Sequence, residues 1–158
     1  PFSLGLWCRD GECWCRVAEY YHSGRATGVQ LTDEEYYAHL CELAGDRPIA
    51  ALIIDPSAAS FAETVLRHGR YPVLKADNDV VAGIHRVSRA LQQAQIKIAP
   101  ECKDALREFS LYQWDNSLRR DAPKKENDHA MDDIRYFVST VLNGEEPGGV
   151  CALAVERK

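Results

Sequence analysis

The feature that most constrains the fold is an apolar run, residues 50–54 with the sequence AALII, which ends in Asp55. A short apolar run bounded by Pro48 and Pro56 is typical of a fully buried strand. Such strands occur in sheets that helices cover on both faces. In open α/β sheets, functional groups gather at the carboxyl ends of the strands, where Asp55 lies. Asp55 is therefore either a site residue or the cap of the helix that follows.

The first twenty residues read as a β-hairpin. Strand-like residues 4–8 and 13–20 flank Asp10-Gly11, which is a typical two-residue turn. This turn would set Cys8 opposite Cys13, where a cross-strand disulfide is conceivable. Because the six cysteines show no C-x-x-C spacing, we expect neither a zinc site nor a disulfide framework, and we interpret them as reduced thiols.

Strand and helix signals alternate along the rest of the chain. Thr32 and Glu35 form a capping box that begins a helix, and Gly45 ends it. Ser57 is expected to cap a second helix, and Asn78 is a candidate cap for a third. The periodicity predicts strands at 49–54, 71–75 and 96–98, and helices at 57–69, 80–93, 102–112 and 129–142. A hairpin followed by strand-helix repeats predicts an α/β fold, with a mixed sheet flanked by helices.

The length of 158 residues is that of a single domain. We expect this domain over residues 1–143, and a tail or an extra strand over residues 144–158. No apolar stretch approaches the roughly 20 residues that cross a bilayer, so no membrane partner is expected. The phosphate-binding pattern G-x-x-x-x-G-K-[ST] is absent from the sequence, so the chain alone is not expected to hydrolyse ATP.

The charge distribution leaves room for a nucleic-acid partner. The formal net charge of -5 is unfavourable for such a partner but does not exclude it, because basic residues cluster locally. The alternative is that these residues form solvated helix faces. The residues expected to contact the backbone of double-stranded DNA are Lys75, Arg86, Arg89, Arg119, Arg120, Lys124 and Lys125.

Four polar residues near the end of the chain complete the candidate site. Asp128, His129, Asp132 and Asp133 fall within six residues, and His129 and Asp132 lie at i and i+3 on one helix face. With Asp55, the first three form a set of metal ligands whose carboxylates and imidazole suit Mg²⁺ or Mn²⁺. Asp133 lies about 100° further round the helix, so we expect it to face solvent or to stand behind the ligands. Taken singly, these are also the acids that a helix favours in its first turn.

Two divalent cations held roughly 4 Å apart activate a water and stabilise the leaving oxygen of a phosphodiester. Hydrolytic phosphoryl transfer is therefore the predicted reaction, and Asp55, His129 and Asp132 are the predicted catalytic residues. Asp55 would bridge or hold metal and Asp132 would complete the site. His129 would ligate metal or orient the attacking water.

Four ordered motifs resemble the C-terminal nuclease domain of tailed-phage terminase large subunits. They are residues 55–58 (DPSA), residues 75–84 (KADNDVVAGI), Glu108-Phe109 with Tyr112, and residues 128–136 (DHAMDDIRY). The resemblance implies a ribonuclease H-like fold and a Mg²⁺- or Mn²⁺-dependent endonuclease that cuts concatemeric viral DNA. It also implies an ATPase domain, a small terminase subunit and a portal as partners, in the cytoplasm of the bacterial host.

One family acid has no counterpart in this sequence. Family members carry an acid in a first strand, just before a segment that matches the start of this chain at Pro1. We therefore expect a nuclease domain that lacks its first strand, with an incomplete metal site and with reduced or absent cleavage. The alternatives are another ribonuclease H-like nuclease of recombination or repair, and a non-catalytic domain that docks DNA or a protein.

Overall fold

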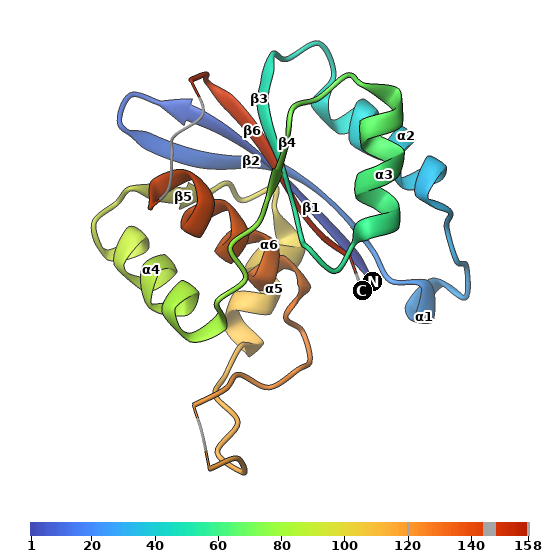
Figure 1. Ribbon diagram of the computed structural model, residues 1–158. Coiled ribbons are helices and arrows are strands. Elements are labelled where there is room, and N and C mark those ends of the chain that lie inside the picture. Colours follow the sequence, from blue (N-terminus) through green and yellow to red (C-terminus); the bar gives the residue numbers. More distant parts are fainter. Residues whose placement is uncertain (120, 144–147, 158) are drawn as a thin grey trace.

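The computed structural model describes residues 1–119, 121–143 and 148–157, which form one six-stranded sheet with helices on both faces (Figure 1). The strands are β1 (Phe2–Asp10), β2 (Cys13–His22), β3 (Ile49–Ile54), β4 (Val73–Lys75), β5 (Ile96–Ile98) and β6 (Cys151–Arg157). The helices are α1 (Gly24–Thr27), α2 (Asp33–Ala44), α3 (Ala59–His68), α4 (Val80–Gln92), α5 (Lys103–Leu111) and α6 (His129–Phe137). A π-helical turn at Val138–Leu142 continues α6.

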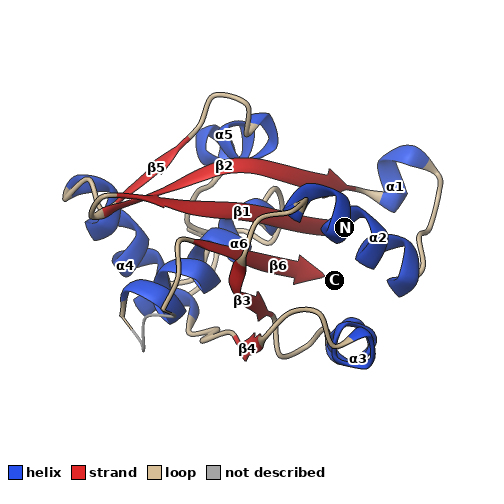
Figure 2. Ribbon diagram, turned by 90° about the horizontal axis from the view of Figure 1, so that it is seen from above, coloured by secondary structure: helices blue, strands red, loops and turns tan. Residues whose placement is uncertain are grey.

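The sheet is mixed, as predicted, and its order is β4-β3-β6-β1-β2-β5. The last strand, β6, lies in its middle and pairs antiparallel with β1 and parallel with β3 (Figure 2). Both neighbours give β6 backbone partners along most of its length, and the strand is buried from Cys151 to Glu156. The carboxyl ends of β3 and β6 therefore meet at the same edge of the sheet.

Each face of the sheet has its own core, because side chains alternate along a strand. Leu52 and Ile54 of β3 pack with α2 and α3, whereas Ile53 packs on the opposite face with α6. On β6, Ala152 and Ala154 lie on the α6 face. Their small side chains let α6 pack closely against the centre of the sheet.

The hairpin turn lies one residue later than predicted. Asp10 pairs with Cys13, which leaves Gly11 and Glu12 as the turn residues, and Gly11 adopts φ +63°. A register shift after Leu6 accompanies this turn. The predicted Cys8–Cys13 pairing is wrong, since Cys8 lies opposite Cys15 on β2.

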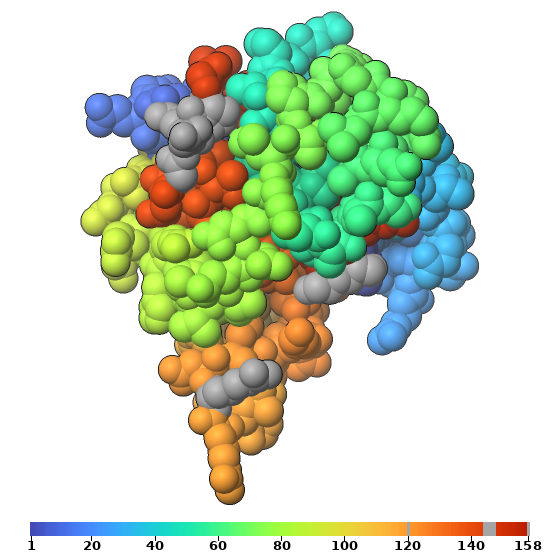
Figure 3. Space-filling view, viewed as in Figure 1, coloured from blue at the N-terminus to red at the C-terminus, as the bar shows by residue number. Residues whose placement is uncertain are grey.

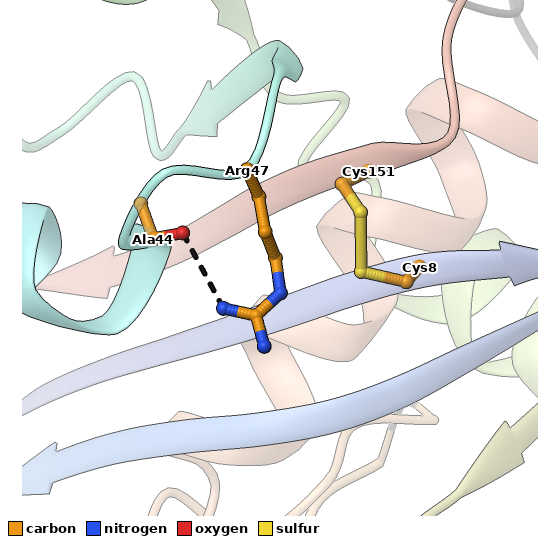
Figure 4. Close-up of a disulfide and its surroundings, with 4 residues drawn as sticks. All are labelled: Cys8, Ala44, Arg47 and Cys151. Carbon is orange, nitrogen blue, oxygen red and sulfur yellow. Dashed lines mark hydrogen bonds between the residues drawn. A yellow bond between two sulfur atoms is a disulfide. The ribbon is translucent and has the colours of Figure 1, made fainter.

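A disulfide joins Cys8 of β1 to Cys151 of β6 (Figure 4). The interpretation of all six cysteines as reduced thiols is therefore wrong for this pair. The reason is that β6 pairs with β1 across 143 residues of sequence, a contact that no local spacing indicates. The other four cysteines are free: Cys13, Cys15, Cys41 and Cys102.

The structure confirms one of the predicted helix caps and contradicts two others. The Thr32–Glu35 capping box is present at the start of α2. Ser57 does not cap α3, because its hydroxyl donates to Asp55 Oδ2 at 2.5 Å instead. At α4 the cap is Asp79, whose carboxylate accepts from the Ala82 backbone N–H, and not Asn78.

None of the described helices is long and apolar enough to span a membrane.

Candidate active site

Asp55 follows directly on β3 and is only 3% exposed. Its backbone N–H donates to the Val155 carbonyl of β6. Its carboxylate accepts from the Ser57 backbone N–H at 3.0 Å and from the Ser57 hydroxyl. These bonds belong to the turn that leaves β3, so Asp55 does not cap α3. The turn instead fixes the carboxylate at the edge of the sheet.

Asp128 and Asp132 approach the same edge from α6. Both are buried, at 7% and 6% exposure. Asp132 Oδ1 accepts from Arg135 Nη2 at 2.9 Å across one helical turn. Burial lowers the pKa of Arg135, but the neighbouring Asp132 carboxylate outweighs it and the pKa lies above its ordinary value. In this structure Asp132 is therefore held in a charged pair.

The three carboxylates line one cavity of about 540 Å³. Asp55 directly follows β3, Asp128 directly precedes α6, and Asp132 lies in the first turn of α6. The His129 side chain is 14% exposed, and its Nε2 lies 3.8 Å from Oδ1 of the preceding residue, Asp128. The structure thus places three of the four predicted metal ligands, Asp55, Asp128 and Asp132, around one cavity, and metal binding by the four stays a prediction.

Of the two expectations for Asp133, exposure to solvent is wrong. Asp133 is fully buried and pairs with the fully buried Arg16 of β2, with Arg16 Nη2 3.1 Å from Asp133 Oδ2. The Ser3 hydroxyl donates to the same oxygen at 2.5 Å. Burial raises the pKa of Asp133 to about 6, while Arg16 and Ser3 act against the shift. Asp133 thus anchors α6 to the sheet.

Gly5 of β1 makes room for this pair, because an added Cβ there would overlap the Arg16 guanidinium.

Carboxylate donors have the chemistry that a hard divalent cation requires. Within the described ranges, however, no group of three or more His, Cys, Asp or Glu side chains is close enough to hold a metal ion. The Arg135 guanidinium pairs with Asp132, one of the predicted metal ligands. The types of donor therefore suit such a cation, but the described residues do not form a metal site as they are arranged in this structure.

The predicted DNA-binding residues divide into two groups. Lys75 at the end of β4 and Arg89 on α4 are exposed, and Arg86 is paired with Asp77 at 2.8 Å. Arg119, Lys124 and Lys125 belong to the segment between α5 and α6, and Arg120 lies outside the described residues. Lys125 lines the same cavity as the acids. DNA contact by these residues stays a prediction.

The segment between α5 and α6 projects from the body of the molecule (Figure 3). An antiparallel bridge joins Trp114 to Pro123, and we call the segment between α5 and α6 the arm. Trp114 is 40% exposed. The arm lies next to the acids, because Ala122, Pro123 and Lys125 line their cavity.

Solved structures of one phage protein resemble the chain. The large terminase from a thermophilic bacteriophage, in complex with ADP, matches with a TM-score of 0.85 and 41% sequence identity. This match covers 90% of this chain and 37% of that one. Another crystal form of the same terminase gives a TM-score of 0.84 and 41% identity, over 89% of this chain and 36% of that one. The chain belongs to the phage large-terminase family.

The terminase domain spans little more than a third of the length of the large terminase that it matches. Its mixed sheet confirms the predicted ribonuclease H-like α/β fold and the resemblance on which that prediction rested. No protein-family model matches the chain, and a search among curated proteins gives no match either.

Glu108 of α5 was noted in the sequence only as part of a motif and was given no role, yet in the terminase domain it caps the start of α6. Glu108 is fully buried, and its Oε2 accepts from the Ala130 backbone N–H at 2.7 Å. Its Oε1 accepts from the Tyr21 hydroxyl at 2.8 Å. The Asp128 side chain, which precedes α6, accepts no capping hydrogen bond. Glu108 on α5 instead provides the acceptor for a backbone N–H in the first turn of α6. Only the tertiary structure shows this.

We expect Glu108→Ala to lower the free energy of unfolding by about 2–3 kcal/mol, because the substitution leaves the Ala130 N–H and the Tyr21 hydroxyl without their acceptor. Urea unfolding followed by circular dichroism measures the change. The matched control is Glu63→Ala, which changes an exposed glutamate of α3 and should shift stability by less than about 0.5 kcal/mol. Equal effects of the two substitutions would contradict the capping role.

Proposed function

We propose that this domain is a Mg²⁺- or Mn²⁺-dependent endonuclease that cuts concatemeric double-stranded DNA during phage DNA packaging. The observation that carries the proposal is the shared cavity, in which Asp55 from the end of a buried strand meets Asp128 and Asp132 from α6. The similarity to a phage large terminase supports the packaging context. We also propose that the domain acts in the cytoplasm of the bacterial host. Its proposed partners there are the ATPase domain, the small terminase subunit and the portal.

We assign two roles to the residues in and beside the cavity: some would bind metal and others would bind substrate. Asp55, Asp128 and Asp132 would hold the cations, with His129 as a further ligand or as the residue that orients the attacking water. When bound, divalent cations activate a water and stabilise the leaving oxygen of the phosphodiester. Lys125, on the cavity wall, supplies positive charge for a backbone phosphate.

Arg135 has a role of its own in the proposed site. Its guanidinium pairs with Asp132 and supplies positive charge beside that carboxylate when no cation is bound. Its guanidinium lies within reach of the cavity that it helps to line. Binding of a cation to Asp132 would release Arg135 toward a phosphate, which a guanidinium binds well.

The proposal is tested with Asp55→Asn and Asp132→Asn, which preserve side-chain shape and remove the charge. We expect each substitution to lower Mn²⁺-dependent plasmid nicking by about 100-fold or more and to weaken Mn²⁺ binding. Nicking is followed by gel electrophoresis during a Mn²⁺ titration, and Mn²⁺ binding by electron paramagnetic resonance. Both assays are needed, since they separate binding of the ion from cleavage.

Asp46→Asn is the matched control, because Asp46 is an exposed acid in the turn after α2. It should leave nicking and Mn²⁺ binding unchanged. Full activity in either site variant would remove that residue from the site. If the unsubstituted chain bound no Mn²⁺ at all, the endonuclease proposal itself would be rejected.

A second candidate function is a non-catalytic domain that docks DNA or a partner protein. The observation in its favour is that no three potential ligands in the described part of the chain are close enough to hold a metal ion. The same assays discriminate between the two functions. A docking domain would bind DNA without Mn²⁺ and would not nick it, whereas an endonuclease would do both with the ion present.

A further inference from the structure

The carboxyl end of β6 carries an acid beside the proposed site, Glu156. Ile54 of β3 pairs with Val155 of β6, so Asp55 and Glu156 are the next neighbours along these parallel strands. Ile53 and Ala154, one step before that pair, both pack on the α6 face. Because side chains alternate along a strand, Asp55 and Glu156 point to the α6 face as well.

Glu156 is fully buried and contacts two residues of α6. Its Oε2 accepts from the Tyr136 hydroxyl at 3.2 Å. Its Oε1 lies 3.7 Å from His129 Nδ1. Burial raises the pKa of Tyr136, and the Glu156 carboxylate raises it further, so this hydroxyl stays protonated and donates. Glu156 thus connects the middle strand of the sheet to the helix that carries Asp132 and His129.

A purely structural role does not require a carboxylate at this position. Burial of an ionised carboxylate carries a desolvation penalty of several kcal/mol. The preceding β6 residues on the same face are the alanines Ala152 and Ala154, which pack against α6 without such a penalty. An acid at Glu156 is therefore explained by what it contacts, and the imidazole that it faces is that of His129.

We propose that Glu156 is a positioning residue of the site, whose carboxylate faces His129 Nδ1 and favours the ring orientation and the tautomer in which Nδ1 carries the proton. The 3.7 Å between the two atoms is an ion-pair distance, longer than a hydrogen bond, and a small movement of either side chain would close it. A carboxylate behind a functional histidine commonly has this effect. The other ring nitrogen, Nε2, faces Asp128 Oδ1 at 3.8 Å, and with the proton on Nδ1 its lone pair is left to act as a ligand. The catalytic meaning of this arrangement rests on the proposed function, whereas the contact itself does not.

The first experiment uses the unsubstituted chain. Nitrogen-15 NMR of the histidine rings reports which nitrogen carries the proton, and comparison with His129→Gln assigns the signals of His129. We expect the proton on Nδ1 whenever the ring is neutral. A ring that carries its proton on Nε2 alone would overturn the proposal, because Nδ1 would then have nothing to donate to Glu156.

The second experiment compares Glu156→Gln with Tyr136→Phe. Glu156→Gln should shift the His129 ring signals and lower kcat for plasmid nicking by about 10- to 100-fold, with KM for DNA unchanged. Tyr136→Phe removes the other contact of the same carboxylate and should leave the His129 tautomer as it is. Unchanged His129 signals in Glu156→Gln would reduce Glu156 to a buried structural acid.

The two proposals fail in different ways. If Asp55→Asn and Asp132→Asn left nicking intact, the proposed function would be rejected. The NMR measurement of the His129 tautomer would still test the role of Glu156. If Glu156→Gln did not fold, the NMR measurement on the unsubstituted chain would decide it alone.

Discussion

Reduction of the Cys8–Cys151 disulfide is expected to lower the free energy of unfolding by about 5 kcal/mol. The bond closes a loop with a sequence separation of 143 residues, and a cross-link over so long a loop removes much of the conformational freedom of the unfolded chain. It also ties β6, the middle strand, to β1. Urea unfolding with and without a reductant measures the effect.

Two variants provide the controls for the disulfide. The double substitution Cys8→Ser/Cys151→Ser should show the lower stability and no further response to the reductant. Cys13→Ser changes a free, half-buried cysteine of the same hairpin and should keep the full response. If unsubstituted protein were equally stable with and without the reductant, the disulfide would have no part in holding β6.

Loss of the buried Arg16 charge is the second large effect. We expect Arg16→Met to lower the free energy of unfolding by about 3–5 kcal/mol, because it leaves the fully buried Asp133 carboxylate without its cation. Replacing both partners, as in Arg16→Met/Asp133→Leu, should recover part of that loss, since no buried charge then remains at this pair. Chemical unfolding of the single and double variants gives the coupling between the two residues.

The exposed pair Arg67–Glu34 offers a matched comparison, with side chains 61% and 54% exposed. Arg67→Met should change stability by less than about 1 kcal/mol, because water already solvates both charges. A similar loss for Arg16→Met and Arg67→Met would show that burial of the ion pair contributes nothing to the anchoring of α6.

Local patterns predicted the elements of this fold well, because their causes lie within a few residues. The capping box at Thr32 and Glu35 fixed the start of α2, and the apolar run before Asp55 fixed β3. The same locality explains the errors at the caps. Ser57 has the right spacing to cap α3, but its hydroxyl bonds to the nearer Asp55 carboxylate.

The residues of the candidate site could be proposed from the sequence, whereas their contacts could not. Asp55, Asp128, His129 and Asp132 were visible as a strand-end acid and a helix motif, and the three acids line one cavity in the structure. Their role as metal ligands stays a prediction. Helical spacing left open whether Asp133 faces solvent or stands behind the ligands, because spacing alone does not show that Arg16 of β2 pairs with it. The contacts of Glu108 and Glu156 depend on where α5 and β6 lie in the folded domain, and sequence periodicity does not specify that placement.

The sequence by itself determined most of the strands and helices, though not α1 or β6, and the side chains that have the chemistry of a carboxylate site. Hydrophobic period, capping and residue type act over short distances and can therefore be interpreted locally. Only the tertiary structure decided that β6 lies between β1 and β3. That placement pairs Cys8 with Cys151 and sets Glu156 beside Asp55. The reason is physical: strand order, a cross-link over 143 residues and a buried charge pair depend on contacts between distant segments, which form only when the whole sheet assembles.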